Sequence, residues 1–465
     1  MKSFMNLSVA PCDDFFEYAC GNFRKIMPDP YSRWENLGQT GYVLDDIAKD
    51  LVNRMDLAES LNVSRELRVA QRFYNACLEA DLHPFPAADP HYLKLIRSIG
   101  GFPAVDGAAW NSSNFSWFNM SAHLTNYGAQ GLYDEMLPTL RGDTVGLVVN
   151  DLGFDATVKL DNMKKNSSRA YKRNERRMRG YLRSFNLTED RITEVIDGVF
   201  AFWREALVAI KSEDWDSEFD ITNYYKIAWN KEEEQWSYGS AFVELDKICA
   251  RHPEAVANYL AMQLLYAFDA NLKDVKDQRD YCTTKMRTSM WPLFKKLHLA
   301  ENLSEEKRLG VLEIAQAIWN NWRKIVEEVD WLDSEARKDA LLQVSRNPEF
   351  QFGTPADTSL TDQKIPEILR LEVVDDNYAA TNMNLFRLKV DIERFRTRHS
   401  VEEGFMISQR EMIMDFRENN TNHNLIAAFH GSFLEPPYYH RSWPHSLKFG
   451  TLGFEAGQYF TTVVT

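Results

Sequence analysis

The chain of 465 residues lacks several features that would place it in a common class of protein. It has no run of about 18 apolar residues, so the sequence predicts no transmembrane helix. Its opening residues, MKSFMNLSVAPCDD, hold no apolar stretch of the usual signal-peptide length. Taken alone, these two absences favour a cytosolic protein.

A basic surface is not evident either. The formal net charge is −14, which repels phosphate backbones, and we find no basic stripe with interleaved aromatic residues. The sequence therefore predicts no nucleic-acid partner.

Metal and nucleotide motifs are scarce. The chain has five cysteines and none lies in a CxxC pair, which argues against a zinc–thiolate site. His440 and His445 are five residues apart with Pro444 between them, whereas a helix presents two zinc ligands at a spacing of four, so we interpret them as solvated loop residues. GTLGFEAG lacks both a preceding strand and a following Lys-Ser/Thr, so it predicts no phosphate loop, and no GxSxG motif is present.

What the sequence does contain is a helical core. Hydrophobic residues make up 44% and aromatic residues 13%, enough for a packed interior. Apolar residues recur at i, i+3, i+4 and i+7 in three segments, 70–78, 192–210 and 311–329, which predicts long core-facing helices. The best strand candidates, 145–151 and 156–160, predict one hairpin around Gly153. The predicted fold is mainly α, and the length predicts about three domain-sized units or one domain with a large insertion.

N-glycosylation sequons point away from the cytosol. The composition gives about three Asn-x-Ser/Thr by chance, whereas nine occur. This excess predicts passage through the secretory pathway, and chance sequons in Ser-rich loops are the alternative. The candidate glycosylated residues are Asn6, Asn62, Asn111, Asn114, Asn119, Asn166, Asn186, Asn302 and Asn419.

A series of short motifs resembles the neprilysin family of zinc metallopeptidases, in the family's order. The series comprises PCDDFFEYACGNF at 11–23, RFYNACLEAD at 72–81, IGGFP at 99–103, WREALVAI at 203–210, ANYLAMQLL at 257–265, Cys282, DWLDSEARKDAL at 330–341 and FLEPPYY at 433–439. The last is similar to the Leu-Gln-Pro-Pro-aromatic segment before the family's zinc helix.

This resemblance implies a large multi-helix domain that faces a thermolysin-like α+β zinc-peptidase domain. We expect an N-terminal tail at 1–10, a mostly helical neprilysin-type region at 11–400, and the start of the catalytic domain at 401–465, truncated at the zinc helix. It also implies that the two domains enclose a chamber which admits peptides.

Aligned with the family's G-H-E-x-x-H, the segment GFEAGQYFTT places Gln458 and Thr462 where two zinc-binding histidines stand and Tyr459 where the general base stands. The third zinc ligand of the family would lie beyond Thr465. A neutral amide and a hydroxyl are poor zinc ligands, and a phenol with a pKa near 10 is a poor base at neutral pH. We therefore expect no bound zinc and no peptide hydrolysis. The family's substrate-binding Asn-Ala-aromatic segment aligns only loosely, on FREN at 416–419.

The resemblance also implies a disulfide between Cys77 and Cys282. Cys12 and Cys20 match cysteines that the family pairs with C-terminal partners absent from this chain. Cys249 has no family counterpart, and either a buried free thiol or an intermolecular bridge would account for it.

The preferred hypothesis is a non-catalytic neprilysin homologue that binds peptides or partners and belongs to an extracellular or plasma-membrane lineage. One alternative is an active zinc endopeptidase with a different, unrecorded C-terminus. A second alternative is an intracellular helical scaffold without glycans.

Overall fold

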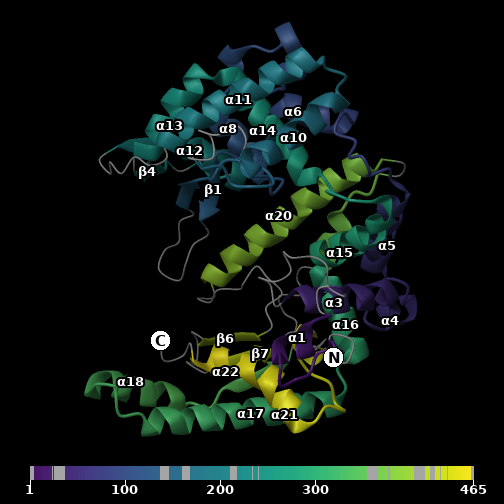
Figure 1. Cartoon of the computed structure of the whole chain (residues 1–465), viewed down its shortest axis with the longest axis vertical. Helices are drawn as coiled ribbons and strands as arrows, with labels where there is room; N and C mark the ends of the chain where they lie inside the picture. The colour runs from purple at the N-terminus through teal and green to yellow at the C-terminus, as the bar shows by residue number, and fades with distance from the viewer. Residues whose placement is uncertain are drawn as a thin grey trace.

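The computed structural model describes residues 5–22, 25, 37–136, 146–159, 168–209, 217–232, 234–238, 240–352, 365–374, 377–402, 414–418, 425–429, 431–436 and 438–461. Helices dominate these residues, so the predicted mainly α class is confirmed. Figure 1 shows an upper and a lower lobe, with α20 (Tyr378–Glu402) running obliquely between them. No described helix combines the length and apolar character that a membrane crossing requires.

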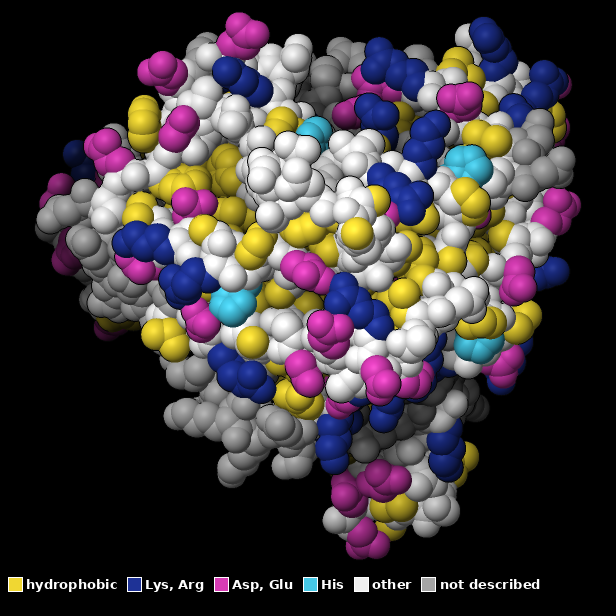
Figure 2. Space-filling view, turned by 90° about the horizontal axis from the view of Figure 1, so that it is seen from above, with side chains coloured by type: hydrophobic (Ala, Val, Ile, Leu, Met, Phe, Trp, Pro, Cys, Tyr) yellow, Lys and Arg dark blue, Asp and Glu magenta, His cyan; other side chains and the backbone are white. Residues whose placement is uncertain are grey.

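The upper lobe is a helical bundle with two small antiparallel sheets. Its elements are α6 (Pro90–Ile99), α7 (Pro103–Asp106), α8 (Trp117–Thr125), β1 (Tyr133–Met136), β2 (Gly146–Val149), α10 (Arg169–Ser184), α11 (Glu189–Ala209), β3 (Glu218–Asp220), α12 (Thr222–Tyr224), β4 (Trp236–Tyr238), α13 (Ser240–Arg251) and α14 (Pro253–Phe268). Seen from above, its surface carries charged side chains of both signs, with Lys and Arg gathered most densely at the upper right (Figure 2).

The core of the upper lobe forms around α14, which is buried on nearly every side. A helix that is apolar all round belongs in the interior. The stripe predicted at 192–210 lies on α11 and is buried over its described part, with Trp203 meeting Tyr259 of α14 edge to face at a centroid distance of 5.2 Å. The predicted helix is therefore confirmed.

The predicted hairpin between 145–151 and 156–160 is wrong. β2 pairs instead with the earlier strand β1, in antiparallel register from Tyr133↔Val149 to Met136↔Gly146. Within 156–159, the part of the second segment that the structure describes, a single bridge forms, between Gly153 and Thr157. The carbonyl oxygen of Gly153 accepts a hydrogen bond from Nε2 of Gln263 (2.8 Å), so the turn is attached to α14 and does not extend a ladder.

A second helical layer connects the lobes. It contains α3 (Leu37–Leu51), α4 (Met55–Ser60), α5 (Ser64–Glu79), α15 (Gln278–Ser289) and α16 (Trp291–Asn302), and it packs around its own apolar core together with α20. The predicted stripe at 70–78 lies on α5, where Ala70, Phe73 and Cys77 are buried.

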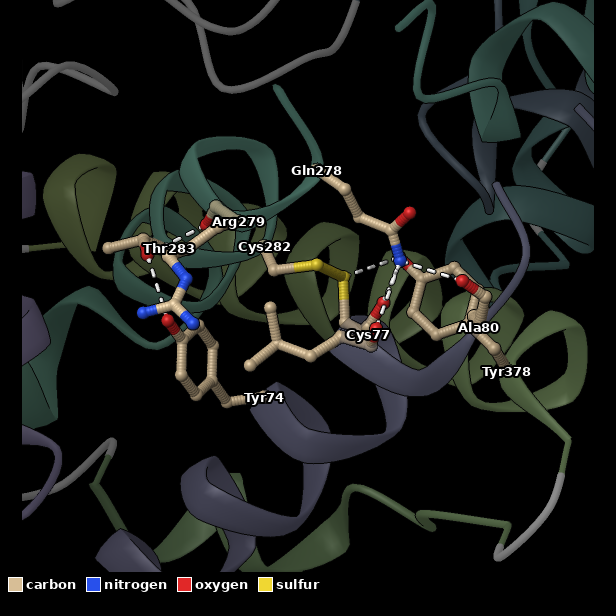
Figure 3. The surroundings of a disulfide bond; sticks show 9 residues. Tyr74, Cys77, Ala80, Gln278, Arg279, Cys282, Thr283 and Tyr378 are labelled. Atoms are coloured by element: carbon tan, nitrogen blue, oxygen red, sulfur yellow. Dashed lines mark hydrogen bonds between the residues drawn. A yellow bond between two sulfur atoms is a disulfide. The ribbon is translucent and has the colours of Figure 1, made fainter. Parts of the chain in front are cut away.

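The disulfide implied by the family resemblance is present in this layer. Cys77 and Cys282 are joined with their Cα atoms 5.8 Å apart, which connects α5 to α15 (Figure 3). One turn before Cys282, Nε2 of Gln278 donates to the carbonyl oxygens of Cys77 (2.8 Å) and Ala80 (2.7 Å). Carbonyls at a helix C-terminus have no partner within the helix, so Gln278 satisfies the end of α5.

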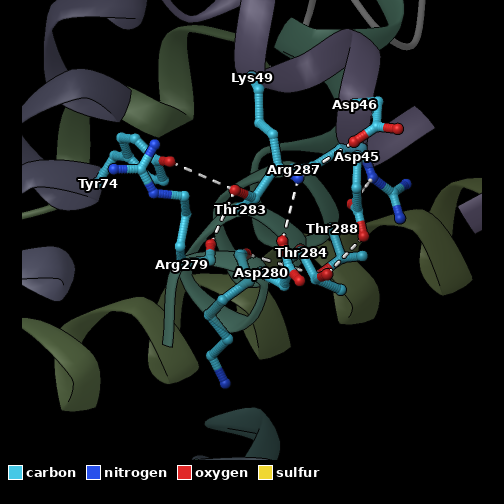
Figure 4. A network of polar contacts seen from close by, with 11 residues as sticks. Asp45, Asp46, Lys49, Tyr74, Arg279, Asp280, Thr283, Thr284, Arg287 and Thr288 are labelled. Carbon is cyan, nitrogen blue, oxygen red and sulfur yellow. Dashed lines mark hydrogen bonds and ion pairs between the residues drawn. The ribbon is translucent and has the colours of Figure 1, made fainter. Parts of the chain in front are cut away.

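A polar junction joins α3 to α15 next to the disulfide (Figure 4). Nε of Arg287 lies 2.6 Å from Oδ1 of Asp45, and the two side chains are only 7% and 13% exposed. Oγ1 of Thr284 donates to the other carboxylate oxygen of Asp45 (2.5 Å). Nearby, Lys49 pairs with Asp280 at 3.0 Å, but that pair is largely in solvent.

The lower lobe mixes helices with a small sheet. Its elements are α17 (Glu305–Glu328), α18 (Ser334–Ser345), β5 (Glu349–Phe352), β6 (Met414–Glu418), β7 (Leu425–Phe429), α21 (His445–Lys448) and α22 (Phe454–Thr461), and α1 (Phe15–Cys20) lies beside them in Figure 1. β7 is the central strand, parallel to β5 and antiparallel to β6. This lobe thus draws on residues from both sides of position 400, and the division of the chain into domains stays a prediction.

The stripe predicted at 311–329 lies on α17, with one correction. Val311, Ile314, Ala315 and Val326 are buried as expected, but Ile325 is 51% exposed. Trp319, outside the predicted stripe, is buried instead. The burial pattern departs from a single stripe because α17 packs against α22 along its middle and against α18 near its end.

Candidate functional site

The segment aligned with the family's zinc helix forms α22, which follows a π-helical turn at Phe449–Gly453. Glycines bring this segment close to α17. A Cβ placed on Gly453 would lie 3.4 Å from Cδ1 of Ile318, and one on Gly457 would lie 3.8 Å from Cγ2 of the same side chain. Since Gly453 is also buried, a larger residue there would displace α17 or Phe449.

One face of α22 is packed into the core of the lower lobe. Ala456 and Phe460 are fully buried, and the ring of Phe460 meets Trp319 of α17 edge to face at 5.2 Å. Contacts of this kind position the helix irrespective of any bound group.

The opposite face carries the residues aligned with the catalytic motif. At about 100° per residue, Glu455, Gln458 and Tyr459 share one side of the helix. Gln458 is exposed and the other two are half-buried. Thr462, the third aligned position, lies outside the described residues. Of the two aligned positions that the structure describes, Gln458 therefore lies in solvent, whereas Tyr459 packs partly against the core of the lower lobe.

Glu455 is the carboxylate of this face. Its partial burial raises the pKa of the carboxyl above its ordinary value, which favours the protonated form. A protonated carboxyl is a weaker metal ligand than a carboxylate, and a single carboxylate supplies at most one side chain of a zinc site.

The segment before the π-helical turn is anchored in the core. Phe433 and Leu434 are fully buried, and Tyr438 and Tyr439 nearly so. The carbonyl oxygen of Tyr438 accepts a hydrogen bond from Oγ1 of Thr451 (2.6 Å), which ties this segment to the turn that leads into α22.

A buried polar cluster underlies this anchor. Nζ of Lys307 lies 2.6 Å from Oε1 of Glu435, with both side chains less than one-fifth exposed. Nε2 of His298 lies 3.4 Å from the carbonyl oxygen of Gly431 and 3.7 Å from Oε1 of Glu435.

The protonation states of this cluster follow from its burial. Burial lowers the pKa of His298 to about 4, so the imidazole is neutral at neutral pH. Burial raises the pKa of Glu435, and the hydrogen bond from Lys307 opposes that shift. The cluster connects α16 and α17 to the segment before α22, and its side chains bond one another, so its role is positional.

The described donors of α22 do not fit zinc. Protein zinc sites use His nitrogen, Cys sulfur and Asp or Glu oxygen. Gln458 offers a neutral amide, and the phenol of Tyr459 would have to lose a proton with an ordinary pKa near 10 to bind as an anion. Within the described ranges, no three His, Cys, Asp or Glu side chains are grouped so that they could hold a metal ion.

The other candidate residues are dispersed. His440 is an exposed loop residue, as predicted, and its Nδ1 lies 2.7 Å from Oγ of Ser442. His445 is exposed as well, but it begins the short helix α21 and does not lie in a loop. Cys12 and Cys20 are exposed thiols. Cys249 is buried and unpaired, and burial raises the pKa of its thiol well above the ordinary value, which agrees with the buried free thiol.

The sequon asparagines differ in their surroundings. Asn62, Asn111, Asn114 and Asn186 are exposed. Asn6 donates to Glu17, Asn302 donates to the backbone of α16, and Asn119 lies within α8 with its Oδ1 buried. Asn166 and Asn419 lie outside the described residues. Glycosylation at all nine positions stays a prediction.

Comparison with known proteins decides the family. Residues 11–237 match the model of Peptidase family M13. The chain is 22% identical to neprilysin-2 of Caenorhabditis elegans over 99% of its own length and 69% of that protein, and 19% identical to neprilysin of Oryctolagus cuniculus over 98% and 69%. The chain belongs to the neprilysin family, peptidase family M13.

Solved structures share this fold. The crystal structure of Mycobacterium tuberculosis zinc metalloprotease ZMP1 in complex with an inhibitor superposes with a TM-score of 0.59 at 12% identity, covering 98% of this chain and 73% of that one. PepO from Lactobacillus rhamnosis gives a TM-score of 0.56 at 13% identity, covering 90% and 70%. The M13 resemblance predicted from short motifs is therefore confirmed, and these likenesses concern the fold alone.

Sequence reasoning missed two groups of residues in this M13 chain. The cluster of His298, Lys307 and Glu435 joins residues up to 137 positions apart in the sequence. FLEPPYY was noticed only for its prolines and aromatics, although its Glu replaces the expected Gln. The second group is a set of basic side chains on α10, which was overlooked because the net charge of the whole chain is acidic.

Proposed function

We propose that this chain is a non-catalytic neprilysin homologue that keeps the packing of the zinc helix without its chemistry. The observation that carries the proposal is the side-chain chemistry of α22, where the exposed Gln458 and the half-buried Tyr459 stand at positions that align with a zinc ligand and the general base. Zinc-activated water supplies the nucleophile in such peptidases, because the metal lowers the pKa of water from about 15.7 to about 7. A helix face without ligands offers no means of holding that metal.

Zinc content and peptide cleavage test this proposal together. The purified full chain is incubated with zinc, desalted and analysed for bound metal, then assayed on a quenched fluorescent peptide with and without chelator. We expect well under one equivalent of zinc and no chelator-sensitive cleavage. One equivalent of zinc with chelator-sensitive cleavage would instead support an active zinc endopeptidase.

A matched variant tests whether the replaced residues of α22 account for the low zinc binding. Gln458→His, Tyr459→Glu and Thr462→His together return the two histidines and the glutamate to the same backbone. We expect this variant to take up more zinc than the parent protein, since two imidazoles one turn apart form half of a tetrahedral site. Equal zinc uptake by the two proteins would contradict the alignment of α22 with the zinc helix.

For the retained scaffold we propose peptide or partner binding. The support is the family membership and the ordered packing around α22, both of which are independent of the replaced residues. Titration of fluorescent peptides of 5 to 10 residues tests this: saturable binding is expected, and its loss in Gln458→Arg would locate the peptide near α22.

We also propose that the protein enters the secretory pathway, on the excess of sequons and the exposure of Asn62, Asn111, Asn114 and Asn186. Material from eukaryotic cells should lose mass on glycosidase treatment, with glycans at these four positions and none at the helical Asn119. An unchanged mass would favour the intracellular scaffold.

A further inference from the structure

The helix α10 is strongly basic in a chain whose net charge is −14. Its sixteen residues, RAYKRNERRMRGYLRS, include a single acidic side chain, Glu175. The basic side chains are Arg169, Lys172, Arg173, Arg176, Arg177, Arg179 and Arg183.

Three of these side chains are neutralised by neighbours. Arg177 bonds Asp155 at 2.7 Å and Asp269 at 2.9 Å. Arg179 pairs with Glu175 at 3.0 Å, and Arg183 pairs with Glu189 at 2.7 Å. These pairs fix the helix in the lobe.

The other four form no ion pair with any described residue. We name Arg169, Lys172, Arg173 and Arg176 the basic row, because spacings of three and four residues place them on one side of the helix. The row extends about 10 Å along the helix axis, at 1.5 Å per residue. It is a line of uncompensated positive charge on an acidic protein.

A pocket of about 760 Å³ adjoins the row, and Arg173 and Arg176 line both. Lys273, exposed and without an ion-pair partner among the described residues, lies on its rim. Asp155 and Asp269 also face the pocket but are engaged by Arg177, and the hydroxyl of Tyr181 donates to Asp269 (2.9 Å). The charge left free at this pocket is therefore positive.

We propose that the basic row and its pocket bind a sulfated polysaccharide. The guanidinium fork matches oxyanions with two parallel hydrogen bonds. Several unpaired cations in a line suit an anion that repeats along a chain better than a single small anion.

Nucleic acid fits this surface less well. Binding of single strands relies on aromatic rings that are free to stack with bases. The rings of Tyr181 and Tyr266 at this pocket are approached by the guanidinium of Arg177, at 6.0 and 5.5 Å from their centroids. The choice of sulfate over phosphate esters rests on the proposed secretory location, but it does not depend on the state of α22.

Binding of a size-defined heparin oligosaccharide to the full chain tests the proposal, measured by calorimetry at several salt concentrations. The double variant Arg173→Glu, Arg176→Glu should weaken binding at least tenfold and make it less dependent on salt, since each lost ionic contact reduces the salt slope by about one. Its melting temperature should stay unchanged, because neither side chain has an ion-pair partner to lose. Arg173→Lys with Arg176→Lys should bind more tightly than the Glu variant, because the charge is kept, but more weakly than the parent protein, because lysine lacks the guanidinium fork.

The control variant is Lys338→Glu on α18, where Lys338 is exposed on the other lobe. A second control at the same place, Lys338→Glu with Asp339→Lys, leaves the net charge of the protein unchanged. Less than a twofold change is expected for Lys338→Glu. A comparable loss in this control, no heparin binding at 0.15 M salt, or equal affinity for a DNA oligonucleotide or polyphosphate would each overturn the proposal.

Discussion

The upper lobe and the lower lobe are both packed, but they are held together differently. The upper lobe surrounds one buried helix, α14, with aromatic side chains such as Trp203, whose ring meets Tyr259 of α14. The lower lobe packs short strands and α22 against α17 and includes the buried ionic pair of Lys307 and Glu435. On α22, Ala456 and Phe460 are buried in this core, whereas Gln458 is exposed. The burial that holds this helix in place therefore does not involve the side chain of Gln458.

The largest effect we expect concerns the layer between the lobes. Replacing Cys77 and Cys282 by Ser opens a loop of 205 residues, and the gain in chain entropy of the unfolded state should lower the free energy of unfolding by about 4 kcal/mol. Urea denaturation measures this. The matched control, Cys12→Ser with Cys20→Ser, removes two exposed thiols and should change stability by less than about 0.5 kcal/mol. Equal losses in the two double variants would show that the disulfide does not stabilise this layer.

A second prediction compares two ion pairs of the α3–α15 junction. Arg287→Met leaves the carboxylate of Asp45 buried without its cation, which should lower the free energy of unfolding by about 3 kcal/mol. Lys49→Met breaks a solvent-exposed pair and should lower it by less than about 1 kcal/mol.

The double variant Asp45→Leu, Arg287→Met completes the test by denaturant unfolding. It should be more stable than Arg287→Met alone, because no uncompensated charge remains. If the single and double variants were equally destabilised, loss of packing rather than the buried charge would be the cause.

The parts of the fold that the sequence predicted are those whose signal is local. Trp203 and Phe73 lie on regular apolar stripes, so their helices and burial could be read from periodicity. The burial of Trp319 was not predicted, because α17 packs against two different elements along its length and no single apolar stripe describes both contacts. The pairing of β1 with β2 was not predicted, because tertiary contacts and not the nearest turn determine which strands pair.

The site was predicted in a different way. Gln458 and Tyr459 were found through motif order, since neither residue type signals chemistry by itself. The pairing of Cys77 with Cys282 also came from the resemblance, because five cysteines leave many pairings open. Lys307 and Glu435 are 128 residues apart, and nothing in either segment indicates the other.

A third prediction concerns acid sensitivity of the lower lobe. Burial holds the pKa of His298 at about 4 in the folded protein, below the ordinary 6.5, so the unfolded chain binds more protons between these values. The stabilisation from neutral His298 is complete above pH 6.5 and is lost as the pH falls towards 4, by about 3 kcal/mol. Glu435 shifts in the opposite sense, since its raised pKa favours the folded state at low pH.

The contribution of His298 is therefore measured as the difference between the parent protein and a variant that lacks this imidazole. His298→Gln should reduce the slope of unfolding free energy against pH between 6.5 and 4. The measurement is urea denaturation at a series of pH values. A slope that His298→Gln does not alter would mean that other groups govern the acid response.

The smallest expected effect separates the two faces of α22. Gln458→Ala should change the free energy of unfolding by less than about 0.5 kcal/mol, because the side chain is exposed and alanine favours the helix. Phe460→Ala, two residues along the same helix, should lower it by about 3 kcal/mol, because it empties a buried site against Trp319. Thermal and urea unfolding compare the two. A large loss in Gln458→Ala would mean that the amide has taken over a structural role in place of the family's metal ligand. Near-neutrality would mean instead that position 458 is under no packing constraint, so that its residue can be exchanged without disturbing the helix that carries it.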